Sequence, residues 1–190
     1  MQVDALEIPD LKLITPVKHS DERGFFSEIY SQRDMEAAGL NLSFLQENCS
    51  FSAAKHTVRG LHWQSPPAAQ AKLIQVTQGA ILDVVVDVRL NSPWFGRHVA
   101  VELSADNWQQ LLVPAGFAHG FCTLEENTTV LYKVDAYYSA ADDQGLRWND
   151  PTLSIDWPVS ADAAILSDKD KNLPMLADCD LPFVYAEAKS

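Results

Sequence analysis

The sequence predicts an all-β fold, which could be a sandwich, a barrel or a jelly roll. Short β-rich runs recur through the middle of the chain at spacings of roughly 8–12 residues, as is usual in such folds. Turn-forming segments such as "SPWFG", "SADN" and "EEN" separate these runs. The chain has 190 residues, enough for one domain with a sizeable core, so we expect residues 1–190 to form a single domain.

One helix is well marked near the N-terminus. Ser31 is a favourable N-cap, the following "QRDMEAAG" is rich in helix formers, and its Gly39 fits the position just beyond a helix end. A second helix or turn is expected near residues 160–165.

The strands are expected in the central part of the chain. Residues 71–89, "AKLIQVTQGAILDVVVDVR", read as two β-rich runs joined at Gln78-Gly79, which predicts a hairpin. Further strands are expected in "HVAVELS", "QQLLVPAG", "AHGFCTLE" and "TTVLYKVDAYY". Residues 81–88 are apolar on both faces apart from two aspartates, which predicts an additional packed layer, such as a partner subunit. The proline-punctuated segment 173–185 should wrap over the body.

Charge and cysteine content exclude several classes of protein. The net charge of −12 argues against binding to nucleic acid through the general field of the protein. Three scattered cysteines argue against a disulfide framework or a thiolate zinc site. We see neither a signal peptide nor an apolar run approaching the ~20 residues of a membrane span. A cytoplasmic protein without membrane contact is therefore expected.

Strand alternation places several polar side chains among apolar neighbours. Lys72 should share a face with Ile74 and Val76, and Tyr132 with Val130 and Val134, while His119 should share one with Phe121. A polar group that faces a core needs a partner, and the interior end of a small barrel is also a usual ligand site. Each of these residues taken alone is most simply structural, so only their convergence would indicate function.

The stretch "RGLHWQ" raises a metal site as an alternative. A divalent ion in a barrel would suit a His-x-His pair followed by a carboxylate and a later histidine. Here Gln64 stands two residues after His62, and no carboxylate lies close behind it. We therefore expect no metal and no other cofactor.

The sequence resembles the dTDP-4-dehydrorhamnose 3,5-epimerase family. The resemblance is carried, in family order, by "DERGFFSEIY", "FLQENCSFS", "VRGLHWQSPPAAQAKLIQVTQGAILDVVVDVR", "SPWFG", "QLLVPAGFAHGF", "VLYKVDAYYSAADDQGLRWNDP" and "LSDKD", which together span residues 21–170. It implies a cupin-type double-stranded β-helix, or jelly roll, with a few short peripheral helices. It also implies a metal-independent isomerase that acts on a dTDP-sugar.

The resemblance implies a role for each matching residue. His62 would be the general base, held by Asp170, with Tyr132 as the acid on the opposite side of the sugar and Lys72 facing the C4 carbonyl oxygen. The implied substrate-binding residues are Arg23, Phe26, Glu28, Gln46, Asn48, Arg59, His119, Tyr138, Asp143 and Lys169.

The family also implies a homodimer. Its N-terminal region often reaches into the partner, so Arg23, Phe26 and Glu28 would complete the neighbouring site. Trp63, Cys49 and Asp143 depart from the usual tyrosine, histidine and glutamate. Because Asp143 is shorter than glutamate, its contact with the ligand could become water-mediated.

The residues suit the implied chemistry. A C4 ketone acidifies the protons on C3 and C5, a histidine of near-neutral pKa is a natural base, and a fixed donor at O4 stabilises the enolate. Epimerisation at one carbon only, a related sugar-nucleotide isomerase, a non-catalytic sugar-nucleotide binding module and a cupin metalloenzyme remain as alternatives.

Overall fold

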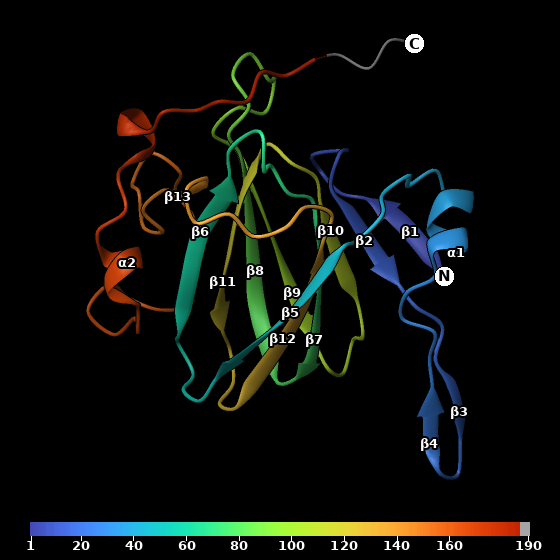
Figure 1. Ribbon diagram of the computed structural model, residues 1–190. Helices are drawn as coiled ribbons and strands as arrows, with labels where there is room; N and C mark the ends of the chain where they lie inside the picture. The colour runs from blue at the N-terminus through green and yellow to red at the C-terminus, as the bar shows by residue number, and fades with distance from the viewer. Residues whose placement is uncertain (187–190) are drawn as a thin grey trace.

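Two antiparallel sheets face each other and form the body of the molecule (Figure 1), in a computed structural model that describes residues 1–186. The six-stranded sheet has the spatial order β1 (Gln2–Ala5), β2 (Lys12–Thr15), β10 (Gln110–Val113), β7 (Lys72–Gln78), β12 (Thr128–Val134) and β5 (Gln46–Ser52). The five-stranded sheet has the order β13 (Asp143–Gly145), β6 (Val58–Gln64), β11 (Phe117–Thr123), β8 (Ala80–Asp87) and β9 (His98–Ser104). The all-β prediction is confirmed.

The main core lies between the two sheets. Ile74, Val76 and Val130 from the six-stranded sheet meet Ile81 and Val85 from the five-stranded sheet. All are almost completely buried, and each such aliphatic side chain contributes about 1.5–3 kcal/mol through removal from water. Because successive residues of a strand point to opposite faces, the same alternation sends every second side chain of these strands into the space between the sheets.

The short helices lie outside the sheets. Helix α1 (Gln32–Ala37) has the predicted N-cap, since the Ser31 hydroxyl accepts a hydrogen bond from the backbone N–H of Asp34. Gly39 follows the helix with a φ of +80°. Residues 160–165 contain a turn, and the nearby helix is α2 (Asp168–Lys171), followed by the 3₁₀ turn η1 (Leu176–Asp178).

The predicted hairpin between β7 and β8 is wrong. Both strands form, but β7 belongs to the six-stranded sheet and β8 to the five-stranded sheet. Only Gly79 separates them, which is too short for the usual two-residue hairpin loop. Gly79 has a φ of +76°, and a Cβ there would lie 2.4 Å from the Thr128 hydroxyl oxygen, so glycine is needed where the chain passes between sheets.

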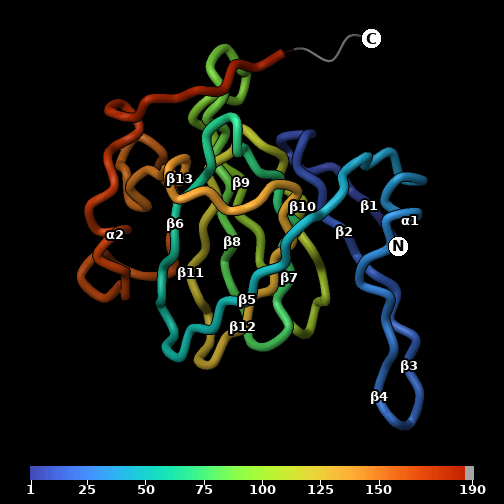
Figure 2. The backbone as a smooth tube through the Cα atoms, in the orientation of Figure 1, coloured from blue at the N-terminus to red at the C-terminus, as the bar shows by residue number. Residues whose placement is uncertain are grey.

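An additional layer covers the outer face of β8, as the apolar pattern predicts. Val84 and Val86 pack there against Trp157, Leu181 and Phe183. This layer comes from the same chain, so the apolar outer face of β8 is covered without a partner subunit. The C-terminal segment wraps over the body as predicted, and Figure 2 shows it crossing the end of the molecule.

A separate hairpin of β3 (His19–Asp21) and β4 (Gly24–Phe26) projects away from the body (Figures 1 and 2). Every residue of both strands is exposed. Exposed aromatic residues on a projecting hairpin are unusual in a monomeric protein. We therefore expect another surface to cover them.

Candidate active site

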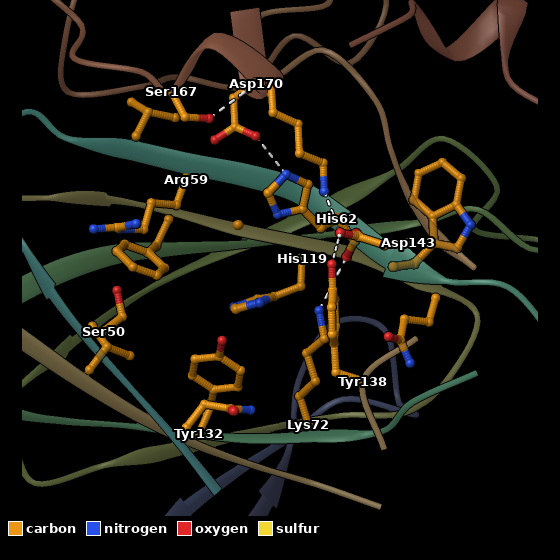
Figure 3. A pocket seen from close by; sticks show the side chains of 18 of the residues that line it. Ser50, Arg59, His62, Lys72, His119, Tyr132, Tyr138, Asp143, Ser167 and Asp170 are labelled. Atoms are coloured by element: carbon orange, nitrogen blue, oxygen red, sulfur yellow. Dashed lines mark hydrogen bonds and ion pairs between the residues drawn. The ribbon is translucent and has the colours of Figure 1, made fainter. Parts of the chain in front are cut away.

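A cavity of about 700 Å³ opens between the two sheets (Figure 3). Residues from the five-stranded sheet, the six-stranded sheet and α2 all contribute to its wall. Of the residues that the sequence singles out, it gathers His62, Tyr132, Asp170, Lys72, Gln46, Asn48, Arg59, His119, Tyr138, Asp143 and Lys169. Candidate side chains more than a hundred residues apart in the sequence therefore line one cavity.

A bulge in β6 places two of these side chains on the same face. Arg59 and His62 are three residues apart, so strict alternation would send them to opposite faces. Across the sheet, His119 pairs with His62 and Phe121 pairs with Arg59, so Gly60 is one extra residue in β6. Arg59 and His62 consequently both line the cavity.

Only glycine fits at the bulge. Gly60 has a φ of +115°, and a Cβ there would lie 2.6 Å from the Cα of Gly120 and 2.8 Å from the carbonyl oxygen of His119. The two strands therefore approach more closely than side chains would allow, and this approach sets the position of the cavity wall.

His62 and Asp170 form a hydrogen-bonded pair. The Nε2 of His62 lies 2.6 Å from the Oδ1 of Asp170, whose side chain is only 4% exposed. Burial by itself raises the pKa of Asp170, but hydrogen bonds from His62 and Ser167 stabilise the carboxylate, and the net pKa lies below its usual value. An ionised carboxylate only accepts hydrogen bonds, so Nε2 carries the proton and Nδ1 is free to act as a base.

Helix α2 holds Asp170 in place. The Ser167 hydroxyl caps this helix by accepting a hydrogen bond from the backbone N–H of Asp170 at 3.1 Å. The backbone N–H of Gly60 approaches the other carboxylate oxygen at 3.5 Å. Asp170 is thus fixed both by its own helix and by the β6 bulge.

Lys72 enters the cavity from the other sheet. Its Nζ lies 3.3 Å from the carbonyl oxygen of His62, to which it donates. Burial lowers the pKa of Lys72 to about 8, and the charges of Asp143 and Asp83 oppose that shift while Lys169 adds to it. At neutral pH the ammonium form still predominates and carries a positive charge into the cavity.

Tyr132 also comes from the six-stranded sheet, on β12. Figure 3 shows its hydroxyl directed into the cavity, on the side away from Asp170. Burial raises the pKa of Tyr132, with Arg59 opposing and Asp143 reinforcing the shift. The phenol is therefore protonated at neutral pH and can donate a proton.

An ionic cluster lies at one side of the cavity. Lys169 Nζ is 2.5 Å from the Oδ2 of Asp143, and the Tyr138 hydroxyl donates to the same oxygen at 3.1 Å. The backbone N–H of Tyr138 donates to Gln46, which in turn donates to Asn48. Asp143 thus reaches its protein partners directly, despite being shorter than the expected glutamate.

Three predicted binding residues lie elsewhere. Arg23 and Phe26 are on the projecting hairpin, where the Arg23 side chain is 84% exposed and Phe26 is 70% exposed. Arg23 pairs only with Asp21 of the same hairpin among the described residues. Glu28 lines a separate, smaller cavity beside α1. The single chain does not bring these three residues to the main cavity.

Sequence reasoning missed several residues of the site. Ser50 and Ser167 line the cavity, and nothing in their local sequence distinguishes them from other serines. Asp83 was also missed, although it accepts a hydrogen bond from the cavity residue His119. The sequence does mark it, because Asp83 is a carboxylate that interrupts an apolar run. A buried carboxylate needs a partner, so this interruption pointed to one.

Within residues 1–186, no three His, Cys, Asp or Glu side chains gather where they could hold a metal ion. No helix among these residues is long and apolar enough to cross a membrane.

Comparison with known proteins identifies the family. Residues 5–178 match the family model described as dTDP-4-dehydrorhamnose 3,5-epimerase. The enzyme of that name from Sinorhizobium fredii is 46% identical over 187 residues, which cover 98% of this chain and 95% of the relative.

Two solved structures extend this similarity to the fold. The dTDP-4-dehydrorhamnose 3,5-epimerase of Bacillus anthracis, solved with TDP and PPi bound, is 54% identical, with a TM-score of 0.89 over 92% of this chain and 98% of that one. The dTDP-6-deoxy-D-glucose-3,5-epimerase of Legionella pneumophila, in complex with dTDP-4-keto-L-rhamnose, is 40% identical, with a TM-score of 0.91 over 97% of this chain and 99% of that one. The fold is thus the cupin-type jelly roll of these epimerases, and the chain belongs to the dTDP-4-dehydrorhamnose 3,5-epimerase family.

Proposed function

We propose that this protein is a dTDP-4-dehydrorhamnose 3,5-epimerase that inverts C3 and C5 of dTDP-4-dehydro-6-deoxy-D-glucose to give dTDP-4-dehydro-L-rhamnose. The observation that carries the proposal is the pairing of a base and an acid across one cavity. His62, held by Asp170, enters from the five-stranded sheet and α2, whereas Lys72 and Tyr132 enter from the six-stranded sheet.

His62 is the base in this proposal. Its Nδ1 takes the proton from the carbon next to the C4 ketone, and the electron pair moves onto O4 to form an enolate. Asp170 keeps the proton on Nε2 and stabilises the imidazolium that results, as carboxylates do in other His–Asp pairs. The hydrogen bond of 2.6 Å and the burial of Asp170 support this role.

Lys72 and Tyr132 act on the intermediate. The Lys72 ammonium, desolvated by its surroundings, stabilises the negative charge that develops on O4. Tyr132 then donates its phenolic proton to the opposite face of the carbon, which inverts the centre. Solvent afterwards removes the proton from His62 and restores that of Tyr132, so the protein returns to its starting state without net proton gain.

The charges of the cavity support a nucleotide diphosphate ligand. The chain carries a net charge of −12, yet Arg59, Lys72 and Lys169 all line this cavity. Arginine binds phosphate oxygens in bidentate geometry, and lysine binds them as a point charge. We assign Arg59 and Lys169 to the diphosphate, with Gln46, Asn48, His119, Tyr138 and Asp143 around the sugar and base.

We further propose that the protein acts as a cytoplasmic homodimer. Arg23, Phe26 and Glu28 lie outside the cavity of their own chain, and two of them are on the exposed hairpin. A projecting hairpin that carries a cation and an aromatic side chain is suited to reach a second subunit. There Arg23 would meet the diphosphate and Phe26 would lie against the base or sugar.

Mixed dimers test this arrangement. The Arg23→Ala and His62→Ala variants should each be inactive, because each removes one part of every site. After the two are unfolded together and refolded, about a quarter of wild-type activity should return, since half of randomly formed dimers are mixed and each of these has one complete site. A mixture that stays inactive despite demonstrated mixed dimers would contradict sharing of the site.

Deuterium exchange tests the reaction itself. We expect incubation with the 4-keto-6-deoxy sugar nucleotide in D₂O to introduce deuterium at both C3 and C5, with product NMR showing inversion at both. Exchange at a single carbon would assign a single-site epimerase instead. Nucleotide binding without exchange at either carbon would leave a binding module and exclude catalysis.

A further inference from the structure

Asp83 is a carboxylate in the middle of the protein interior. It lies on β8, an interior strand of the five-stranded sheet, with 0% exposure, and its neighbours on the same face are Ile81 and Val85 of the main core. Placing an ionised carboxylate among such side chains is costly unless its oxygens are hydrogen-bonded. The reaction as assigned above gives this residue no task.

Asp87, another buried carboxylate on the same strand, has partners that offset the cost of burying its charge. Asp87 is also 0% exposed, and Arg89 donates to it through both the backbone N–H and the guanidinium, while Ser92 donates as well. Its charge is thus met by an arginine and several donors. Asp87 therefore needs no functional explanation.

Asp83 has a different partner. Both of its oxygens lie 2.9 Å from the Nε2 of His119, and no other donor reaches them among the described residues. His119 is itself only 9% exposed and lines the cavity. The carboxylate of Asp83 thus binds a single imidazole, and that imidazole belongs to the active site.

This pairing determines which nitrogen of His119 faces the ligand. Because the Asp83 carboxylate only accepts hydrogen bonds, Nε2 must carry a proton, which leaves Nδ1 as the second ring nitrogen. In the sheet, His119 lies directly opposite His62, whose ring is oriented in the same way by Asp170. Two histidines that are paired across adjacent strands are therefore each bound to a buried carboxylate through Nε2.

We propose that Asp83 is a positioning residue that fixes His119 with Nε2–H toward the core and Nδ1 toward the sugar ring of the substrate, next to the base His62. The inference rests on the proposed epimerase function and deepens it. A cross-strand neighbour of the base lies at the reacting carbons, so Asp83 serves the chemical step. Binding of the nucleotide should depend little on it.

The Asp83→Asn variant provides the kinetic test. Asparagine keeps the shape but can also donate, so it permits the reversed tautomer of His119. We expect kcat to fall at least about tenfold, as is common when the carboxylate that orients a functional histidine is lost. The Kd for dTDP should stay within about twofold, since His119 acts next to the carbons.

The matched control is Asp87→Asn, the same substitution on the same face of the same strand. It should lower the Tm, because it removes the partner of Arg89, but leave kcat per folded molecule unchanged. Equal losses of kcat in the two variants would overturn the proposal, because they would show a general effect of disturbing β8. Unchanged kcat in Asp83→Asn, or loss of dTDP binding without loss of kcat, would also overturn it.

A spectroscopic measurement separates this inference from the proposed function. In ¹⁵N NMR of the wild-type protein, the neutral ring of His119 should show a protonated Nε2 and an unprotonated Nδ1, and Asp83→Asn should change that ratio. The opposite tautomer in the wild-type protein overturns the positioning role, even if Asp83→Asn fails to fold. Wild-type protein that lacks C3 and C5 exchange but has the expected tautomer refutes the proposed function alone.

Discussion

At the scale of one residue, the burial of Lys72 lowers the stability of the fold but places a positive charge in the cavity. Burial lowers its pKa from the usual 10.5 to about 8, so the folded protein binds its proton less tightly than the unfolded chain. Below pH 8 the group is charged in both states and the whole cost of burying the charge opposes folding. Between pH 8 and 10.5 the unfolded chain binds more protons, so this cost diminishes as the pH rises.

The Lys72→Met variant should therefore be more stable and inactive. One pKa unit corresponds to about 1.4 kcal/mol, so at pH 7 the free energy of unfolding should rise by up to about 3 kcal/mol. The gain should shrink when urea unfolding is repeated at pH 10. Lys171→Met, on an exposed part of α2, is the control and should change stability by less than about 0.5 kcal/mol. A less stable Lys72→Met would contradict this account.

The same lysine predicts the alkaline limit of activity. Burial lowers the pKa of Lys72 to about 8; the charges of Asp143 and Asp83 oppose that shift, and Lys169 adds to it. We expect kcat/KM to fall above about pH 8, as the ammonium that we propose to stabilise the enolate loses its proton. A profile of kcat/KM against pH checks this, and a flat profile from pH 7 to 9 would exclude Lys72 as the charged group.

His62 and Tyr132 should separate binding from turnover. Neither residue is assigned to the diphosphate, so His62→Ala and Tyr132→Phe should bind dTDP with nearly wild-type affinity. Both should lose turnover, because one lacks the proposed base and the other the proposed proton donor; loss of such a group typically costs 10²–10⁴-fold. Calorimetric titration with dTDP and an NMR product assay measure the two properties. Wild-type turnover in either variant would refute its role.

At the scale of the element, β6 depends on its bulge. The Gly60→Ala variant would place a Cβ 2.6 Å from the Cα of Gly120, in a conformation that side chains rarely adopt. We expect a loss of at least about 3 kcal/mol in urea unfolding, together with reduced activity, because Arg59 and His62 must move.

A second glycine separates the effect of close packing from the effect of the backbone conformation. Gly39 also has a positive φ, +80°, but a Cβ there would meet nothing within 4 Å. Gly39→Ala should therefore cost only the backbone contribution of about 1–2 kcal/mol and leave activity unchanged. Equal losses in the two variants would show that close packing at the bulge is unimportant.

At the scale of the whole molecule, Arg89 joins segments from both ends of the chain. Its guanidinium pairs with Asp10 and Asp87 and lies 4.3 Å from the ring centre of Phe117 and 4.9 Å from that of Tyr185. The N-terminal region, β8, β11 and the C-terminal segment therefore meet at one side chain. None of these residues lines the cavity.

The Arg89→Met variant should be less stable by about 3–5 kcal/mol, because it leaves the buried Asp87 without its partner. The kcat of the folded fraction should be unchanged. Thermal and urea unfolding measure the first effect. Adding Asp87→Asn should recover part of the lost stability, and a double variant as unstable as the sum of the two single variants would show that the charges are not coupled.

The sequence by itself determined those features that depend on neighbouring residues. Alternation of apolar residues located the central strands, and Ser31 with Gly39 located α1. Alternation also placed Lys72 and Tyr132 on inward faces. The order of short motifs was enough to identify the family, because a family motif is itself a local pattern.

Only the tertiary structure decided how these segments combine. In the folded chain, β7 and β8 belong to different sheets, and Asp83 pairs with His119. The bulge at Gly60 places Arg59 on the same face of β6 as His62. Sheet membership, register and ion pairing depend on contacts between residues distant in sequence. Local periodicity has the same form whichever strand lies alongside, so it carries no information about the neighbour.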